Sequence, residues 1–202
     1  MHRNSISMTG TDLGILLNEL LTSSFFTENI AFTQSQRRES LARNYLLQAM
    51  MLLDRKYVAG FEVKDFSEAS LAEYVQRIGG RCSDMQSVLL RSAVQYLTDA
   101  FPEEEKRLAG IHIPLLLYLA DVAEEAEISP ALFRRWWEFF QSKDVLYENY
   151  RWFCDSGSAE LEKGNERLAV MAQSFCNYHK LEIPEELKAL VTEAADHISD
   201  SS

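Results

Sequence analysis

The sequence predicts an all-α protein, an irregular multi-helix bundle of about eight or nine helices. Apolar residues recur three and four positions apart through most of the 202-residue chain, which is the spacing of an amphipathic helix. Serine, threonine or aspartate precedes many of these stretches, at the place of a helix N-cap. Only 8 glycines and 4 prolines leave little turn chemistry for an all-β fold. No fixed period repeats, so the sequence does not predict a solenoid.

Four helices are predicted in the first half of the chain. Their expected bounds are Thr11 or Asp12 to Phe26, Thr33 or Ser35 to Tyr57, Ser67 or Ser70 to Ile78, and Ser83 to Ala100. Gly79-Gly80 and Pro102 are expected to end the third and the fourth helix. The segments TENIAF and VAGFEVKDF break the helical pattern, so we expect a loop and an extended linker there, and EEEKR after Pro102 is expected to form a solvated acidic turn.

The second half begins with the most apolar stretch of the chain. Pro114 fits the first turn of a helix whose leucines cover most of its circumference, and such a helix belongs in the middle of a core. Ser129-Pro130 is expected to open a second helix, whose aromatic side chains recur at i, i+3, i+4 and i+7: Phe133, Trp136, Trp137 and Phe140. Two further helices are expected to start at Ser158, after the loop 155–158, and at Ile183-Pro184. Gly164-Asn165 is expected to kink or interrupt the first of these two.

Length and composition predict one helical domain over 11–198, with a soft division near 101–110. Residues 1–10 are expected to form a disordered lead, and 199–202 a frayed end. The net charge of −11 and the pI of about 4.9 favour solubility and oppose nonspecific binding to nucleic acid or to an anionic membrane. Three widely spaced cysteines and a polar N-terminus without a signal peptide predict a cytoplasmic protein.

The search for catalytic, cofactor and metal motifs is negative. The chain has no glycine-rich phosphate loop, GxSxG, HExxH or calcium-loop pattern, so we expect no cofactor, no metal and no enzymatic activity. His112 is expected to be a structural histidine. Cys176 and His179 stand three positions apart, and would form a nucleophile pair only if a distant acid joined them. Cys82, next to an arginine, is a candidate reactive thiol.

The scarce basic residues mark the candidate contact surfaces. Arginine beside an exposed aromatic ring is typical of protein and nucleic-acid contacts. The tryptophans are expected to be core, with the arginines at its border. The alternative, because adjacent tryptophans cannot occupy the same line of a helix, is that one ring of Trp136-Trp137 is exposed or at an interface. The candidate partner-binding residues are Arg134, Arg135, Trp136, Trp137, Arg151 and Trp152, followed by Arg37, Arg38 and Arg43.

The segment QRRESLARNYLLQAMMLLDRKYVAGFEVKDFSEASLAEYVQRI resembles the helical region that follows the nucleotidase domain in GmrSD-type restriction proteins. The matching features are Arg37 and Arg38, the apolar run 46–53, Gly60, the linker 64–66 and the short helix through 71–74. HIPLLLYLADVAEEAEISPALF and NYRWFCDSGSAELEKGNERLAV resemble later helices of the same region. The family's nucleotide-hydrolysing and HNH-type nuclease motifs are both absent, so the resemblance implies a helical connector without either catalytic end.

Together these observations predict a non-enzymatic interaction or regulatory module that acts through protein–protein contacts. The resemblance implies a subunit or connector of a bacterial restriction or phage-defence system. The expected partner is a protein, or a second copy of the chain, and no membrane. The alternatives are a nucleic-acid-binding accessory protein that uses the Arg/Trp surface, and an acidic inhibitor that mimics nucleic acid.

Overall fold

The structure is a computed structural model that describes residues 10–31, 35–102, 108–154 and 160–200. The expected lead before residue 10, the acidic turn 103–107, the loop 155–158 and the last two residues lie outside the described part. No helix within it is long and apolar enough to cross a membrane.

The described residues form an all-α bundle of ten α-helices, with two short 3-10 helices and two very short strands. The elements are, in order, α1 (Asp12–Leu21), α2 (Ser24–Glu28), β1 (Ile30–Ala31), α3 (Ser35–Tyr57), α4 (Glu68–Arg77), α5 (Asp84–Ala100), β2 (Leu108–Ala109), η1 (Gly110–His112), α6 (Ile113–Glu125), α7 (Pro130–Lys143), α8 (Leu146–Cys154), α9 (Leu161–His179), η2 (Glu185–Leu187) and α10 (Lys188–Asp200).

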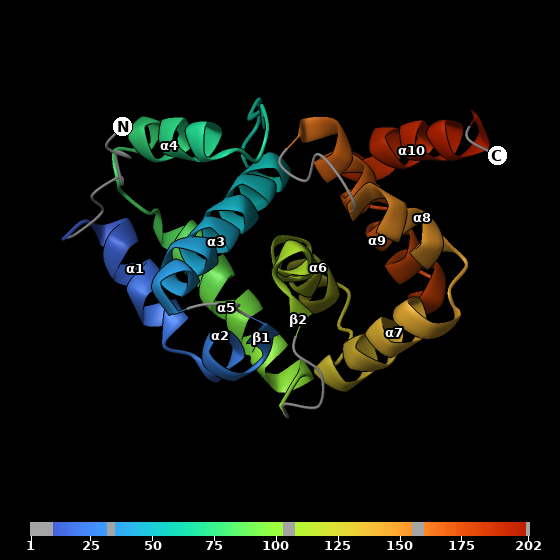
Figure 1. Cartoon of the computed structure of the whole chain (residues 1–202), viewed down its shortest axis with the longest axis horizontal. Helices are drawn as coiled ribbons and strands as arrows, with labels where there is room; N and C mark the ends of the chain where they lie inside the picture. The colour runs from blue at the N-terminus through green and yellow to red at the C-terminus, as the bar shows by residue number, and fades with distance from the viewer. Residues whose placement is uncertain (1–9, 32–34, 103–107, 155–159, 201–202) are drawn as a thin grey trace.

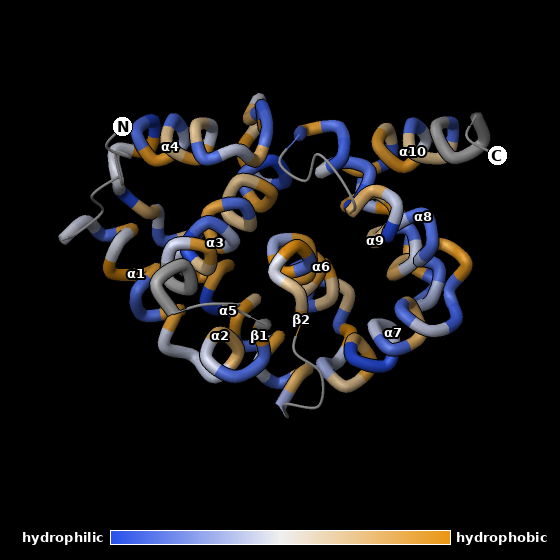
Figure 2. The backbone as a smooth tube through the Cα atoms, in the orientation of Figure 1, coloured by the Kyte–Doolittle hydropathy of each residue, from blue (hydrophilic) through white to orange (hydrophobic). Residues whose placement is uncertain are grey.

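Helix α6 lies at the centre of the molecule, where Figure 1 views it nearly end-on. Every residue from Ile113 to Ala123 is buried, because the helix is apolar over most of its circumference and needs neighbours on all sides. Helices α3 and α5 contact it from the N-terminal half, and α9 contacts it from the C-terminal half. Figure 2 shows apolar residues on the inner sides of many surrounding helices. The buried apolar residues of both halves belong to one core cluster.

Local capping chemistry sets the starts of several helices. Thr11, Ser67 and Ser83 are N-caps whose hydroxyls accept backbone amides of α1, α4 and α5. At Ser83 the Gln86 side chain reaches back to the Ser83 amide and completes a capping box. These starts confirm the predicted positions, as does Ser35 for α3. Gly79 and Gly80, both with positive φ, follow α4 as predicted.

The predicted helix count was too low because two breaks were missed. The first predicted helix is two, α1 and α2, separated at Thr22 and Ser23. Helix α8 was not predicted separately; the side chain of Asp144 starts it by accepting the Leu146 amide at 2.9 Å. The predicted TENIAF loop contains β1, which pairs in parallel with β2 through Ile30 and Leu108. The last predicted helix begins as η2 and continues as α10.

Helix α9 differs from its prediction at both its start and its interior. Its N-cap is Glu160, not Ser158, which lies outside the described residues. The predicted kink at Gly164-Asn165 is absent, since the helix runs unbroken from Leu161 to His179. Gly164 instead admits the Phe66 ring of the linker: a Cβ at Gly164 would lie 2.4 Å from a Phe66 ring carbon. Beside it Asn165 Oδ1 accepts Arg55 Nη1 of α3 at 2.8 Å.

Substituting Gly164→Ala should therefore destabilise the protein, although glycine-to-alanine changes inside helices usually stabilise. We expect a loss of about 1–3 kcal/mol in the free energy of unfolding, the usual cost of overpacking. Chemical denaturation of the purified variant measures it. A Phe66→Leu background, which shortens the opposing ring, should remove most of the penalty. Equal penalties in both backgrounds would show that the close approach is not the cause.

Candidate functional site

The adjacent tryptophans of α7 are both core residues. Trp136 is 0% exposed and Trp137 is 3% exposed, so both are core as expected, and the alternative that one ring of this pair reaches the surface is wrong. Neighbouring helix positions differ by about 100°, and the aromatic face of α7 is wide enough to include both. Trp136 Nε1 donates to Ser174 Oγ of α9 at 3.0 Å, and Trp137 lies against His112. Neither ring is available to a partner.

Trp152 on α8 is the tryptophan that reaches the surface, with 56% of its area exposed. Its neighbour Phe153 is 1% exposed and anchors the helix in the core. Lys163 of α9 lies over the indole, with Nζ 4.1 Å from the ring centroid. Val145, 84% exposed, lies in the turn just before α8. Trp152 on α8 and Val145 just before this helix therefore present two apolar side chains to solvent.

The predicted basic residues do not gather around these two side chains. Arg151 is next to Trp152, exposed and loosely paired with Glu148 at 3.5 Å. Arg134 pairs with Glu138 on α7, and Arg135 is exposed on the same helix. Within the described part of the chain, the ring contacts of Trp152 are with Phe153 and Lys163 and include neither arginine of α7.

The three arginines of α3 lie elsewhere. Arg43 donates to Asn18 Oδ1 of α1 at 2.7 Å, on the N-terminal side of the molecule. Arg37 and Arg38 fall in the first turn of α3, and their side chains are outside the described part. Of the nine candidate residues, Arg151 and Trp152 are the pair in which an exposed arginine stands next to an exposed aromatic ring in the described part of the chain.

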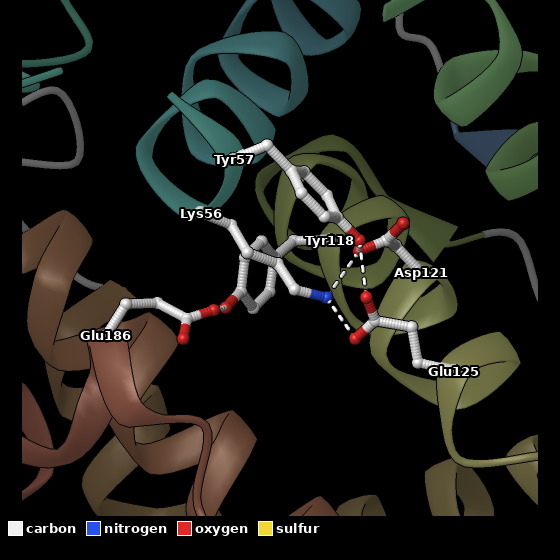
Figure 3. Close-up of polar contacts among 6 residues, drawn as sticks. All are labelled: Lys56, Tyr57, Tyr118, Asp121, Glu125 and Glu186. Atoms are coloured by element: carbon white, nitrogen blue, oxygen red, sulfur yellow. Dashed lines mark hydrogen bonds and ion pairs between the residues drawn. The ribbon is translucent and has the colours of Figure 1, made fainter. Parts of the chain in front are cut away.

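A polar cluster that the sequence did not predict joins the end of α3 to α6 (Figure 3). Lys56 Nζ lies 2.7 Å from Asp121 Oδ2 and 2.5 Å from Glu125 Oε2. The Tyr57 hydroxyl is 2.9 Å and 2.6 Å from the same two carboxylates. Burial is the largest cause of the raised pKa of Tyr57, and the two carboxylates raise it further. The hydroxyl therefore stays protonated and donates to the carboxylates. The cluster leaves Lys56 fully engaged and acts as a clamp between helices.

A neighbouring contact connects the C-terminal segment to α6. The Tyr118 hydroxyl donates to Glu186 Oε1 of η2 at 2.7 Å (Figure 3). Burial is the largest cause of the raised pKa of Tyr118, and Glu186 raises it further, which keeps this donor protonated.

The sequence signal for the Lys56 clamp is the position of Lys56 and Asp121. Each is a charged residue next to an apolar run that predicts a buried helix.

His112 of η1 lies in a second cluster, with Trp137 of α7, Tyr150 of α8 and Arg167 of α9. Its Nδ1 is 2.5 Å from the Tyr150 hydroxyl, and its ring packs against Trp137. Burial, with a smaller contribution from the Arg167 cation, lowers the pKa of His112 to about 4. Burial raises the pKa of Tyr150 well above its usual range, so the phenol can donate to a neutral imidazole. His112 is a structural histidine in this arrangement.

The cysteines form no nucleophilic site in the described residues. Burial raises the pKa of Cys176 to about 11, which keeps its thiol protonated, and no hydrogen bond joins it to His179 there. Cys82 is half-buried, and burial raises its pKa as well, contrary to the prediction of a reactive thiol. No group of three or more metal-ligating side chains converges within the described part.

Comparison with known proteins adds no relative. No family model matches the chain, and neither a curated protein nor a solved structure matches it.

Because the Lys56 clamp is buried, removing the Lys56 ammonium should lower the free energy of unfolding by a large amount. In Lys56→Met the carboxylate of Asp121, whose side chain is 6% exposed, loses its cation, and we expect a cost of about 3 kcal/mol in unfolding free energy. Lys64→Met is the matched control, because Lys64 lies 2.8 Å from Glu73 but both side chains are exposed. Its midpoint of chemical denaturation should stay near wild type. Equal effects of the two variants would contradict the clamp.

His112 should give the protein a specific acid sensitivity. Its pKa is 6.5 ordinarily and about 4 when folded, so between these values the unfolded chain binds a proton that the folded chain does not. The stability from the neutral imidazole is complete above pH 6.5 and is lost as the pH falls towards 4. At about 1.4 kcal/mol per tenfold difference in proton affinity, the loss is on the order of 3 kcal/mol at most.

Denaturation curves between pH 7 and 4 measure this dependence. In His112→Asn the slope of stability against pH should be smaller in that window, whatever the absolute stability of the variant. A slope identical to wild type would show that His112 does not titrate in this way.

Proposed function

We propose that this protein is a non-enzymatic helical module that binds a partner protein through the outer face of α8. The single observation that carries the proposal is the 56% exposure of Trp152 in a protein whose other two tryptophans are buried. Tryptophan and arginine are among the residues enriched in the hot spots of protein interfaces. Val145, 84% exposed in the turn before α8, is a second exposed apolar side chain at the start of this helix.

The surroundings of Trp152 define the kind of partner. Lys163 covers one side of the indole and Arg151 stands next to it, so the ring is bordered by cations on a protein of net charge −11. A complementary partner has an apolar socket for the indole and carboxylates at its rim. The free cysteines support a cytoplasmic location. The resemblance of residues 36–78 to GmrSD-type proteins is the support for a partner within a restriction or phage-defence system.

Substituting Trp152→Ala should weaken the interaction strongly without unfolding the protein. The full chain is used as bait in lysate of its native host, and bound proteins are identified by mass spectrometry. The partner should be retained by wild type and by Val88→Ala, an exposed apolar control on α5. With purified partner, Trp152→Ala should weaken binding by about 2 kcal/mol or more, roughly thirtyfold.

Two results would overturn the proposal. One is a partner retained equally by Trp152→Ala. The other is saturable binding to single-stranded DNA or RNA that weakens steeply with salt and depends on Trp152, which would make the same face a nucleic-acid contact.

A further inference from the structure

A pocket of about 210 Å³ lies where the linker 58–67 passes between α3 and α4. The pocket is far in sequence from the outer face of α8, and its proposed role does not depend on the function proposed for that face. Its charged lining comes from the linker and from one face of α4, and its apolar lining from α3 and α4. The charged and apolar residues of the lining are Met51, Glu62, Lys64, Glu73, Tyr74 and Arg77.

Two of the four charged groups satisfy each other. Lys64 Nζ lies 2.8 Å from Glu73 Oε2, and this contact raises the pKa of Lys64. Glu62 and Arg77 remain. Among the described residues, neither has a hydrogen bond or an ion pair. The pocket therefore offers one uncommitted carboxylate and one uncommitted guanidinium.

Arg77 is held in place without using its hydrogen-bond donors. Its guanidinium carbon is 4.3 Å from the centroid of the Phe61 ring and 5.6 Å from that of Tyr74. Stacking on rings fixes the orientation of the guanidinium and leaves the N–H groups at its edge free. A guanidinium held in this way is suited to receive a carboxylate through two parallel hydrogen bonds.

The apolar part of the lining is also fixed. Met51 is 3% exposed on α3, and Tyr74 is 2% exposed on α4. The Tyr74 hydroxyl donates to Asp54 Oδ2 at 2.7 Å, and Gln86 Nε2 holds the same carboxylate at 2.8 Å. Because this hydroxyl is committed to Asp54, Tyr74 contributes its ring to the pocket and no polar group.

We propose that the pocket binds a small zwitterion of the α-amino acid class. Its carboxylate binds Arg77, its ammonium binds Glu62, and an apolar side chain lies on Met51 and Tyr74. A simple anion would meet the Glu62 carboxylate, and a simple cation would meet Arg77. A ligand that carries both charges satisfies both groups, and the volume limits it to a small molecule.

Isothermal titration of the full chain with L-methionine tests the proposal. Saturable binding is expected, together with a rise in melting temperature at high ligand concentration. Propionate and propylamine each carry one of the two charges, and each should bind at least tenfold more weakly. Arg77→Gln and Glu62→Gln should each lower the affinity for L-methionine at least tenfold. Arg81→Gln and Glu68→Gln, exposed charges that do not line the pocket, are the matched controls and should bind as wild type does.

Circular dichroism confirms that each variant is folded, which is expected because Glu62 and Arg77 are exposed. Any of three results would overturn the proposal: no saturable binding of L-methionine, equal binding of propionate or propylamine, or unchanged affinity in folded Arg77→Gln or Glu62→Gln.

Discussion

The structure depends on the enclosure of helix α6. A helix that is apolar on nearly every side cannot lie on a surface, so other elements have to surround it. Helices α3 and α5 do so on one side and α9 on another. The polar residues that α6 does carry then have to find partners inside the molecule. Asp121 meets Lys56 and Tyr57 of α3, and Tyr118 meets Glu186 of η2. Apolar contacts therefore bury α6, and the polar contacts of Asp121 and Tyr118 join the same helix to α3 and η2.

The sequence predicts what depends on local chemistry. The starts at Thr11, Ser67 and Ser83 need only a hydroxyl and the amides that follow it. The burial of α6 follows from its composition. The prediction failed where the outcome depends on distant residues. Whether Trp136 and Trp137 are both buried is decided by the neighbours of α7. The close packing at Gly164 depends on Phe66, which is distant in the sequence.

The residues of the candidate site also differ in how far their positions depend on local sequence. Trp152 and Arg151 were among the candidate residues because an aromatic residue next to an arginine is a local pattern, whereas the exposure of Trp152 is a property of the fold. The Lys56 clamp was missed because its residues lie 64 to 69 positions apart on separate helices. The linker pocket was missed as well, since Glu62 and Arg77 line one pocket only once α4 packs against α3. Charges at the edges of apolar runs, such as Asp54 and Asp121, were the available signal.

The linker between α3 and α4 has no regular secondary structure, yet its length is fixed by what its side chains reach. Phe66 enters the space left by Gly164, Phe61 supports Arg77, and Asp65 accepts the Ser67 amide at 2.8 Å. Adding or removing one residue would move these contacts out of register. Surface loops usually tolerate changes in length, but related proteins should keep the spacing of this segment even where its residues differ.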